Sequence, residues 1–233
     1  MLAYRGVAHA YGARRVLEGV TLAVQRGERV ALLGPSGAGK TTLFRLAYGA
    51  FAPASGAVLV DDIDLASVRG RALRAVRARI AVVFQQHGLI DQLSVAANVV
   101  AGTFGRRSTA GAVRAVIAPD AADRTIVATA LEHVGLADRA RDRAFDLSGG
   151  QRQRVAIARA IAQRAELVLA DEPAASLDPL LAREIVDVLL ADAHARNAAL
   201  VCTLHQPELT RGFDRVITLD GGRIVHDSRT AAA

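Results

Sequence analysis

The segment that decides the fold is Gly34-Pro35-Ser36-Gly37-Ala38-Gly39-Lys40-Thr41, which matches the pattern of glycine, any four residues, then Gly-Lys-Ser/Thr. The apolar run Arg29–Leu33 precedes it, and helical periodicity begins at Lys40 and continues to about Tyr48. Glycines let backbone N–H groups curl around phosphate oxygens, and the start of a helix adds a partial positive charge. A strand, this loop and then a helix therefore predict a phosphate-binding loop.

Lys40 is the only lysine in the chain, because 28 of the 29 basic residues are arginine. A compact ammonium fits between phosphate oxygens, whereas the broad planar guanidinium of arginine does not. We therefore expect Lys40 to reach the β- and γ-phosphates of a nucleoside triphosphate, with the Thr41 hydroxyl as a ligand of Mg²⁺.

Two further apolar runs, Glu166–Ala170 and Ala198–Leu204, end at Asp171 and His205. Apolar runs without alternation indicate strands that are buried on both faces, as in a parallel sheet covered by helices. Helical patterns at residues 155–163 and 180–195 supply such helices, and residues 216–225 have the pattern of a hairpin. The sequence thus predicts an α/β fold whose ligand lies at the carboxyl ends of the strands.

Acidic and glycine-rich segments add to the predicted site. Asp171, at the end of a buried strand, suits Mg²⁺ coordination, and the adjacent Glu172 suits a general base that polarises the attacking water. The segment Leu147–Gln151 places a serine and two glycines at the start of a helix, which predicts a second anion-binding nest.

Residues 86–145 differ from the rest of the chain because they are rich in alanine and have helical patterns. We expect them to form an inserted helical subdomain, with Ser94 and Asp123 as helix caps and residues 102–120 as a loop or weak helix. Residues 1–85 and 146–233 then form the nucleotide-binding core of a single domain.

Composition narrows the classes of protein. No apolar run approaches the roughly 18 residues that span a bilayer. The first six residues lack the apolar stretch of a secretory signal. The single cysteine, Cys202, fits a small buried side chain in a reducing compartment. The net charge of +6 comes from scattered arginines mixed with acids, with no tryptophan and three tyrosines. Nucleic acid is therefore not an expected partner.

Taken together, these motifs resemble the nucleotide-binding subunit of an ATP-binding cassette (ABC) transporter over nearly the full length. The order matches: phosphate loop, Gln85, the Leu147–Gln151 signature, Asp171-Glu172, and then Asp178 and His205. The resemblance implies a P-loop NTPase core, with a mainly parallel sheet and flanking helices, an N-terminal antiparallel β region and the inserted helical subdomain.

The resemblance also implies roles for particular residues. Tyr11 would stack on adenine, Gln85 (with Gln86 as the adjacent alternative) would contact Mg²⁺ and water while sensing the permease, Asp178 would communicate across a dimer, and His205 would contact the γ-phosphate. The implied catalytic residues are Lys40, Gln85, Glu172 and His205, and the implied ligands of Mg²⁺ are Thr41, Gln85 and Asp171. The implied contacts of ATP are Tyr11, Gly34, Pro35, Ser36, Gly37, Ala38, Gly39, Lys40, Thr41, Thr42, Ser148, Gly149, Gly150, Gln151 and Asp178.

A closer resemblance is to the ATP-binding subunits of bacterial phosphonate importers, carried by residues 83–90, 93–99 and 204–209, where Gln206 follows His205. The chain departs from that group at Pro207, at Ala174-Ala175 and in a shortened, alanine-rich loop at residues 110–120. The resemblance implies an ATPase that energises uptake of phosphonate or a related phosphorus oxyanion. It would act as a homodimer on permease subunits, and indirectly with a solute-binding protein, at the cytoplasmic face of the inner membrane.

Other functions fit parts of the same pattern. Importers of amino acids or metals and lipoprotein-release systems use similar short cassettes. A soluble ABC protein acting on ribosomes or DNA is a further alternative, although such proteins usually carry two cassettes or long coiled-coil insertions, which 233 residues do not accommodate. A nucleotide-binding scaffold without turnover is disfavoured by the complete set of catalytic residues.

Overall fold

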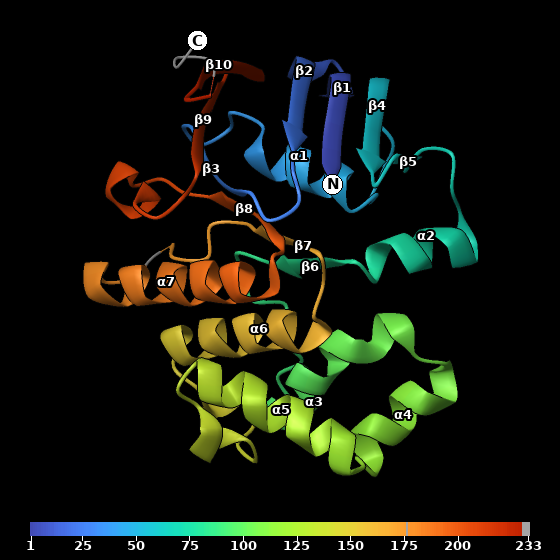
Figure 1. Ribbon diagram of the computed structural model, residues 1–233, viewed down its shortest axis with the longest axis vertical. Helices are drawn as coiled ribbons and strands as arrows, with labels where there is room; N and C mark the ends of the chain where they lie inside the picture. Colours follow the sequence, from blue (N-terminus) through green and yellow to red (C-terminus); the bar gives the residue numbers. More distant parts are fainter. Residues whose placement is uncertain (176, 230–233) are drawn as a thin grey trace.

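Six strands form the central sheet of the computed structural model, which describes residues 1–175 and 177–229 (Figure 1). The strands are β3 (Arg29–Leu33), β6 (Ile80–Val83), β7 (Leu167–Ala170), β8 (Ala199–Thr203), β9 (Arg215–Asp220) and β10 (Arg223–Asp227). Their order across the sheet is β10-β9-β3-β8-β7-β6, and all neighbours pair in parallel except the β9–β10 hairpin. Every residue of β7 and β8 is buried, which is why their sequences are apolar without alternation.

A second, antiparallel sheet contains the N-terminal strands β1 (Leu2–Tyr11) and β2 (Arg14–Val24), followed by β4 (Ser55–Val60) and β5 (Ile63–Asp64). Its order is β2-β1-β4-β5. This sheet confirms the N-terminal antiparallel β region that the resemblance implied.

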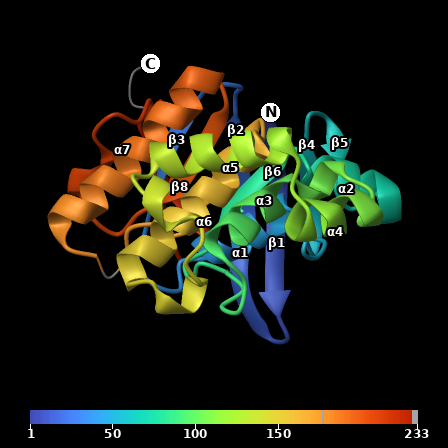
Figure 2. The ribbon, with the colours of Figure 1, turned by 90° about the horizontal axis from the view of Figure 1, so that it is seen from below.

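Helices cover both faces of the central sheet. They are α1 (Lys40–Ala47), α2 (Gly70–Arg77), α3 (Val95–Val100), α4 (Thr109–Ile117), α5 (Ala121–His133), α6 (Gly149–Gln163) and α7 (Pro179–Arg196). Short 3₁₀ helices lie at Ala101–Arg106, Ala137–Arg139, Ala144–Asp146 and Pro207–Thr210. Figure 2 shows α5 beside α6. In the described part of the chain, no helix has both the length and the apolar character needed to cross a bilayer.

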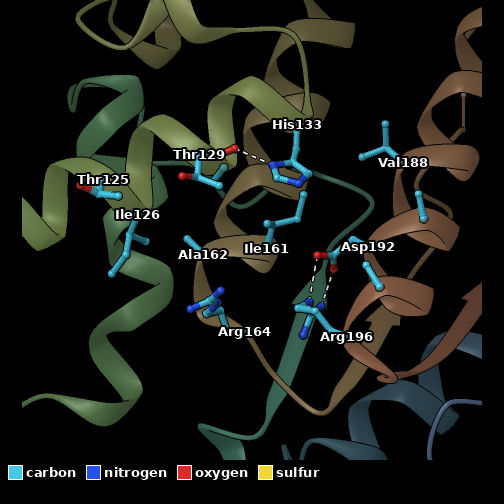
Figure 3. Close-up of a pocket in the computed structure, with 13 residues that line it drawn as sticks. Thr125, Ile126, Thr129, His133, Ile161, Ala162, Arg164, Val188, Asp192 and Arg196 are labelled. Carbon is cyan, nitrogen blue, oxygen red and sulfur yellow. Dashed lines mark hydrogen bonds and ion pairs between the residues drawn. The ribbon is translucent and has the colours of Figure 1, made fainter.

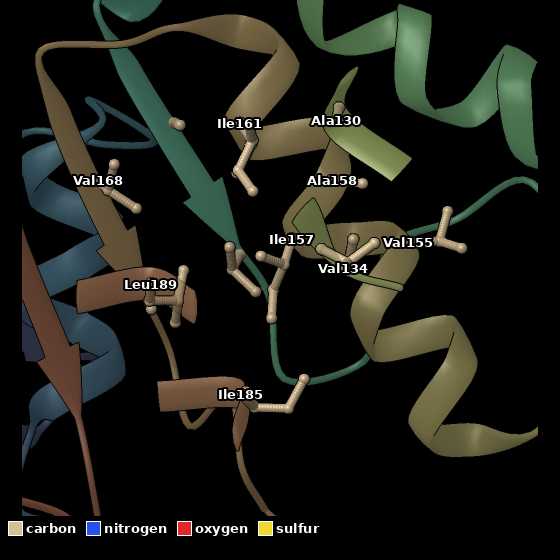
Figure 4. Packing of buried hydrophobic residues seen from close by; sticks show 14 of the residues in the cluster. Ala130, Val134, Val155, Ile157, Ala158, Ile161, Val168, Ile185 and Leu189 are labelled. Carbon is tan, nitrogen blue, oxygen red and sulfur yellow. The ribbon is translucent and has the colours of Figure 1, made fainter. Parts of the chain in front are cut away.

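Alternation along the central strands divides the interior into two cores. Val168 and Leu200 face the core that contains α5, α6 and α7, where Ile157 and Ile185 pack (Figure 4). Their neighbours Leu169 and Val201 face the other core, which contains α1 and the N-terminal sheet. Helices α1 and α6 therefore lie on opposite faces of the central sheet.

The helical region 86–145 has more regular structure than the sequence predicted. Ser94 caps α3 as expected, because its side chain accepts a hydrogen bond from the Ala97 N–H. The prediction that Asp123 caps a helix is wrong: Asp120 is the N-cap of α5, and the Asp123 carboxylate bonds back to the Asp120 N–H. Asp123 lies inside the first turn as the N3 residue of a capping box, and Arg107 and Arg114 pair with its buried carboxylate.

Two further expectations concern single segments. Residues 102–120, expected as a loop or weak helix, contain a 3₁₀ turn and the regular helix α4. Cys202 is fully buried, as predicted, and burial raises the pKa of its thiol far above the ordinary value. The division of the chain into a core and a helical subdomain stays a prediction.

Candidate nucleotide site

The loop between β3 and α1 has a backbone conformation that glycine adopts without strain. Gly34, Gly37 and Gly39 have φ angles of 152°, 83° and 108°, a region that side chains disfavour. A Cβ at Gly34 would lie 2.1 Å from the Leu219 carbonyl oxygen, and one at Gly39 would lie 2.7 Å from Leu17 Cδ2. The loop thus needs glycine, and it leads into the free N–H groups at the start of α1, which attract anions.

The Lys40 side chain lies over this loop. It is only 4% exposed, and its Nζ donates hydrogen bonds to the carbonyl oxygens of Gly34 at 2.7 Å and Pro35 at 3.1 Å. A buried ammonium is stable only where such acceptors compensate for lost water. The single lysine of the chain is therefore held with its charge against the glycine loop, and its contact with phosphate stays a prediction.

Asp171 and Thr203 lie side by side at the carboxyl ends of β7 and β8, on the sheet face that α1 covers. The Thr203 hydroxyl donates to Asp171 Oδ1 at 2.9 Å, and the Thr41 hydroxyl bonds to the same carboxyl group. Burial raises the pKa of Asp171 above its ordinary value, and this effect exceeds the lowering by the two hydrogen bonds. A charged Asp171 is thus best stabilised by a cation close to it.

These groups fit a magnesium ion. Thr41 and Asp171 provide neighbouring oxygen atoms, the ligand type that Mg²⁺ prefers. Within residues 1–175 and 177–229, no cluster of three or more His, Cys, Asp or Glu residues could hold a metal ion. One carboxylate and one hydroxyl agree with a Mg²⁺ that takes its remaining ligands from water and substrate phosphates.

Three predicted catalytic side chains converge on the carboxylate of Glu172. The Gln85 amide donates to Oε2 at 2.9 Å, His205 Nε2 lies 2.6 Å from Oε1, and Lys40 Nζ lies 3.8 Å from Oε1. The Gln85 amide, and not that of the adjacent Gln86, makes this contact. Glu172 has a φ of 50°, a left-handed conformation that is uncommon for a residue other than glycine and typical of functional sites.

Residues 17–175 match the sequence profile of the family described as ABC transporter. The chain belongs to the ABC transporter family. The predicted resemblance to the nucleotide-binding subunits of ABC transporters is confirmed, and so is the predicted P-loop α/β fold.

Similar proteins agree with this family assignment and are ATP-binding proteins. The phosphonates import ATP-binding protein PhnC of Anaeromyxobacter dehalogenans is 46% identical over 99% of the chain, which spans only 46% of that protein. PhnC of Thiobacillus denitrificans is 44% identical over 92% of the chain and 82% of that protein. A solved dimeric ATP-binding cassette in a post-hydrolysis state, bound to ADP and phosphate, is 30% identical, with a TM-score of 0.86 over 97% of both chains.

The structure of this ABC ATPase does not bring the signature segment Leu147–Gln151 to the phosphate loop. Among the residues described, no hydrogen bond or ion pair joins the two segments. The Ser148 side chain instead caps α6 in a reciprocal arrangement with Gln151. A Cβ at Gly149 would meet no atom within 4 Å, whereas one at Gly150 would lie 2.8 Å from Leu181 Cδ2. The signature is an exposed, preformed helix start on the opposite face of the sheet from α1.

Asp178 and Tyr11 also lie apart from the Glu172 cluster. The exposed Asp178 caps α7 by accepting a hydrogen bond from the Leu181 N–H at 3.0 Å. Tyr11 ends β1 with 45% of its surface exposed, and its ring packs edge-on against those of His9 and Phe51. This support leaves part of the Tyr11 ring free for a planar ligand.

Sequence reasoning missed one residue of the site, Thr203, because it lies within an apolar run that reads simply as a buried strand. The only signal in the sequence was a hydroxyl at the end of an apolar run, and the pairing of β8 with β7 is what brings it beside Asp171. A hollow of about 290 Å³ adjoins Thr41, Tyr48, Gln85 and Asp171. A cavity of about 460 Å³ between α5, α6 and α7 lies elsewhere, and no predicted site residue lines it (Figure 3).

Proposed function

We propose that this ABC ATPase hydrolyses ATP to energise uptake of a phosphonate, or a related phosphorus oxyanion, through a partner permease. The observation that carries the catalytic part is the convergence of Lys40, Gln85 and His205 on the Glu172 carboxylate beside the glycine loop. The names of the similar import proteins support the solute class.

The phosphate loop binds the triphosphate in this proposal. Free backbone N–H groups of the glycine loop and of the start of α1 surround the β-phosphate, and Lys40 exchanges its carbonyl partners for phosphate oxygens. Thr41, Asp171 and Gln85 would hold Mg²⁺, which when bound would supply positive charge beside the phosphates. Tyr11 stacks on the adenine.

Glu172 acts as the general base in the same scheme. When ATP is bound, the γ-phosphate takes Lys40 and His205 as its partners, which frees one carboxylate oxygen of Glu172 to accept a proton from the attacking water. Gln85 orients that water. Because Gln85 follows the exposed Phe84 on the same segment, permease contacts on this segment reach the site directly.

A second copy of the chain completes each nucleotide site. The exposed signature nest of one subunit contacts the γ-phosphate held by the other, so that two ATP molecules lie between two chains. Differential affinity of ATP for the closed dimer then drives closure, and hydrolysis reopens it. The similar dimeric cassette supports this arrangement.

The permease docks between α2 and the 3₁₀ helix Ala101–Arg106 in this proposal. A groove of about 300 Å³ there includes Arg74, Phe84 and Gly105 in its walls, and the exposed Ile90 lies on the segment that follows Phe84. This docking would place the chain at the cytoplasmic face of the cell membrane, with the solute-binding protein contacting only the permease.

The test is to purify the chain with the membrane proteins that accompany it and to measure phosphate release in vesicles. Stimulation by phosphonates, but not by amino acids or metal ions, is expected. Stimulation by one of those other solutes would overturn the solute class while leaving the ATPase in place. Salt-sensitive nucleic-acid binding without any permease contact would overturn the transport role.

A further inference from the structure

Thr203 is a buried polar residue without an assigned role. It ends β8, has no exposed surface, and pairs in register with Leu32 of β3. A threonine at such a position needs hydrogen-bond partners, since an unpaired buried hydroxyl is costly. Its two partners are the two acidic residues of the site.

The direction of both hydrogen bonds is fixed by chemistry. The Glu172 N–H can only donate, and it donates to Thr203 Oγ1 at 2.7 Å. The hydroxyl has one proton of its own, which it donates to Asp171 Oδ1 at 2.9 Å. A single side chain therefore holds the carboxylate of Asp171 and the backbone of Glu172 at the same time.

The bond to Glu172 supports an unfavourable backbone conformation. A left-handed backbone conformation is unfavourable for a residue other than glycine, and Glu172 has a φ of 50°. In this conformation its side chain reaches Gln85 and His205. Without the Thr203 bond, the N–H of Glu172 loses its partner, and rotation about φ would move the carboxylate away from them.

We propose that Thr203 is a positioning residue for ATP hydrolysis. Its hydroxyl holds the Glu172 carboxylate and the Asp171 carboxylate in a defined position relative to each other. This inference rests on the proposed function. It predicts that loss of the hydroxyl lowers the turnover rate and weakens the response to Mg²⁺. Triphosphate binding should change much less, because the loop and Lys40 bind the phosphates.

The test compares Thr203→Val, which keeps the shape, with Thr203→Ser, which keeps the hydroxyl. For Thr203→Val we expect kcat to fall about 10- to 100-fold, with KM for ATP nearly unchanged. This is the usual loss when a residue that hydrogen-bonds to a metal ligand is removed. Thr203→Ser should restore most of the rate. Binding of a fluorescent ATP analogue is then measured at increasing Mg²⁺ concentrations. The Mg²⁺ concentration at half-maximal binding should rise for Thr203→Val but not for Thr203→Ser.

A matched control is Cys202→Ala, which perturbs packing in the same strand on the opposite face. It should lower thermal stability without changing kcat or the Mg²⁺ titration. If Thr203→Val does not fold, Thr203→Ala removes the hydroxyl without adding a methyl group against Asp171. Equal rates for the valine and unmutated chains, or a serine variant as slow as valine, would overturn the inference. An unmutated chain without ATPase activity would instead overturn the proposed function.

Discussion

The strand-end site around Glu172 and the signature segment Leu147–Gln151 differ in how much of their geometry one chain completes. At Glu172, side chains from four separate segments already contact one another. At the signature, the contacts are local, because Ser148 and Gln151 bond to each other and Gly149 faces open space. The first is the proposed catalytic centre, whose side chains already meet in one chain, and the second is the proposed binding surface for an ATP molecule held by another chain.

This difference teaches that the fold of one chain brings the contacts around Glu172 together but leaves the signature helix start without a contact to the phosphate loop. Helices α1 and α6 lie on opposite faces of the central sheet, so in the proposed function the two helix starts of one chain contact two different ATP molecules. Turnover should therefore fail in two distinct ways, according to which region is damaged.

The largest expected effect comes from the assembled centre. Glu172→Gln should lower kcat by about 10²- to 10⁴-fold, the usual loss on removing a general base, while ATP binding persists and a closed dimer accumulates. Lys40→Ala should instead weaken ATP binding itself. Phosphate release measures the hydrolysis rate of each variant, and gel filtration with ATP detects the closed dimer. Normal hydrolysis by Glu172→Gln would contradict the catalytic assignment.

At the signature, Gly149→Asp should lower hydrolysis at least about 100-fold, because like charges brought together across an interface cost several kcal/mol. Its Cβ has open space in the single chain, so thermal stability and ATP binding by the monomer should not change. These are measured by thermal unfolding and by a fluorescent ATP analogue.

Mixing Gly149→Asp with Lys40→Ala sharpens the comparison. A mixed dimer pairs the intact loop of one chain with the intact signature of the other, so part of the activity should return. No recovery in the mixture, with dimers detected, would mean that the two regions do not meet across subunits.

A smaller effect is expected at Tyr11, which neither region contacts. Tyr11→Ala should raise KM for ATP about 10-fold, since ring stacking contributes about 1–3 kcal/mol per base, with kcat largely retained. Tyr11→Phe keeps the ring and serves as the control. An unchanged KM for the alanine variant would show that adenine binds elsewhere.

The smallest effect is expected at Asp178. Loss of its cap on α7 in Asp178→Ala should lower the free energy of unfolding by about 1 kcal/mol, whereas Asp178→Asn keeps the cap. If Asp178 also communicates across the dimer, Asp178→Asn should slow hydrolysis without loss of stability in denaturant unfolding. Equal rates for Asp178→Asn and the unmutated chain would leave capping as the role of this residue.

Much of the fold followed from local sequence. The glycine loop, the run Arg29–Leu33 and the helix from Lys40 have the boundaries that composition and periodicity predict, because backbone geometry there depends on glycine and on burial. Helix α5 was less predictable, because Asp120 and Asp123 are both of a residue type that suits a cap. Only the structure shows that Asp120 is the N-cap and that Arg107 and Arg114 pair with the buried Asp123.

The residue types of the site, and their order along the chain, were thus determined by the sequence, since each chemical task admits few side chains. Tertiary structure alone decided that Gln85, His205 and Lys40 meet on Glu172 and that Thr203 supports it. The contacts of Gln85, Thr203 and His205 with Glu172 join segments at the ends of strands that are neighbours in the sheet but more than 30 residues apart in the chain. The physical reason is that spacing along a chain reports local geometry, whereas proximity across a parallel sheet depends on the order in which its strands pack.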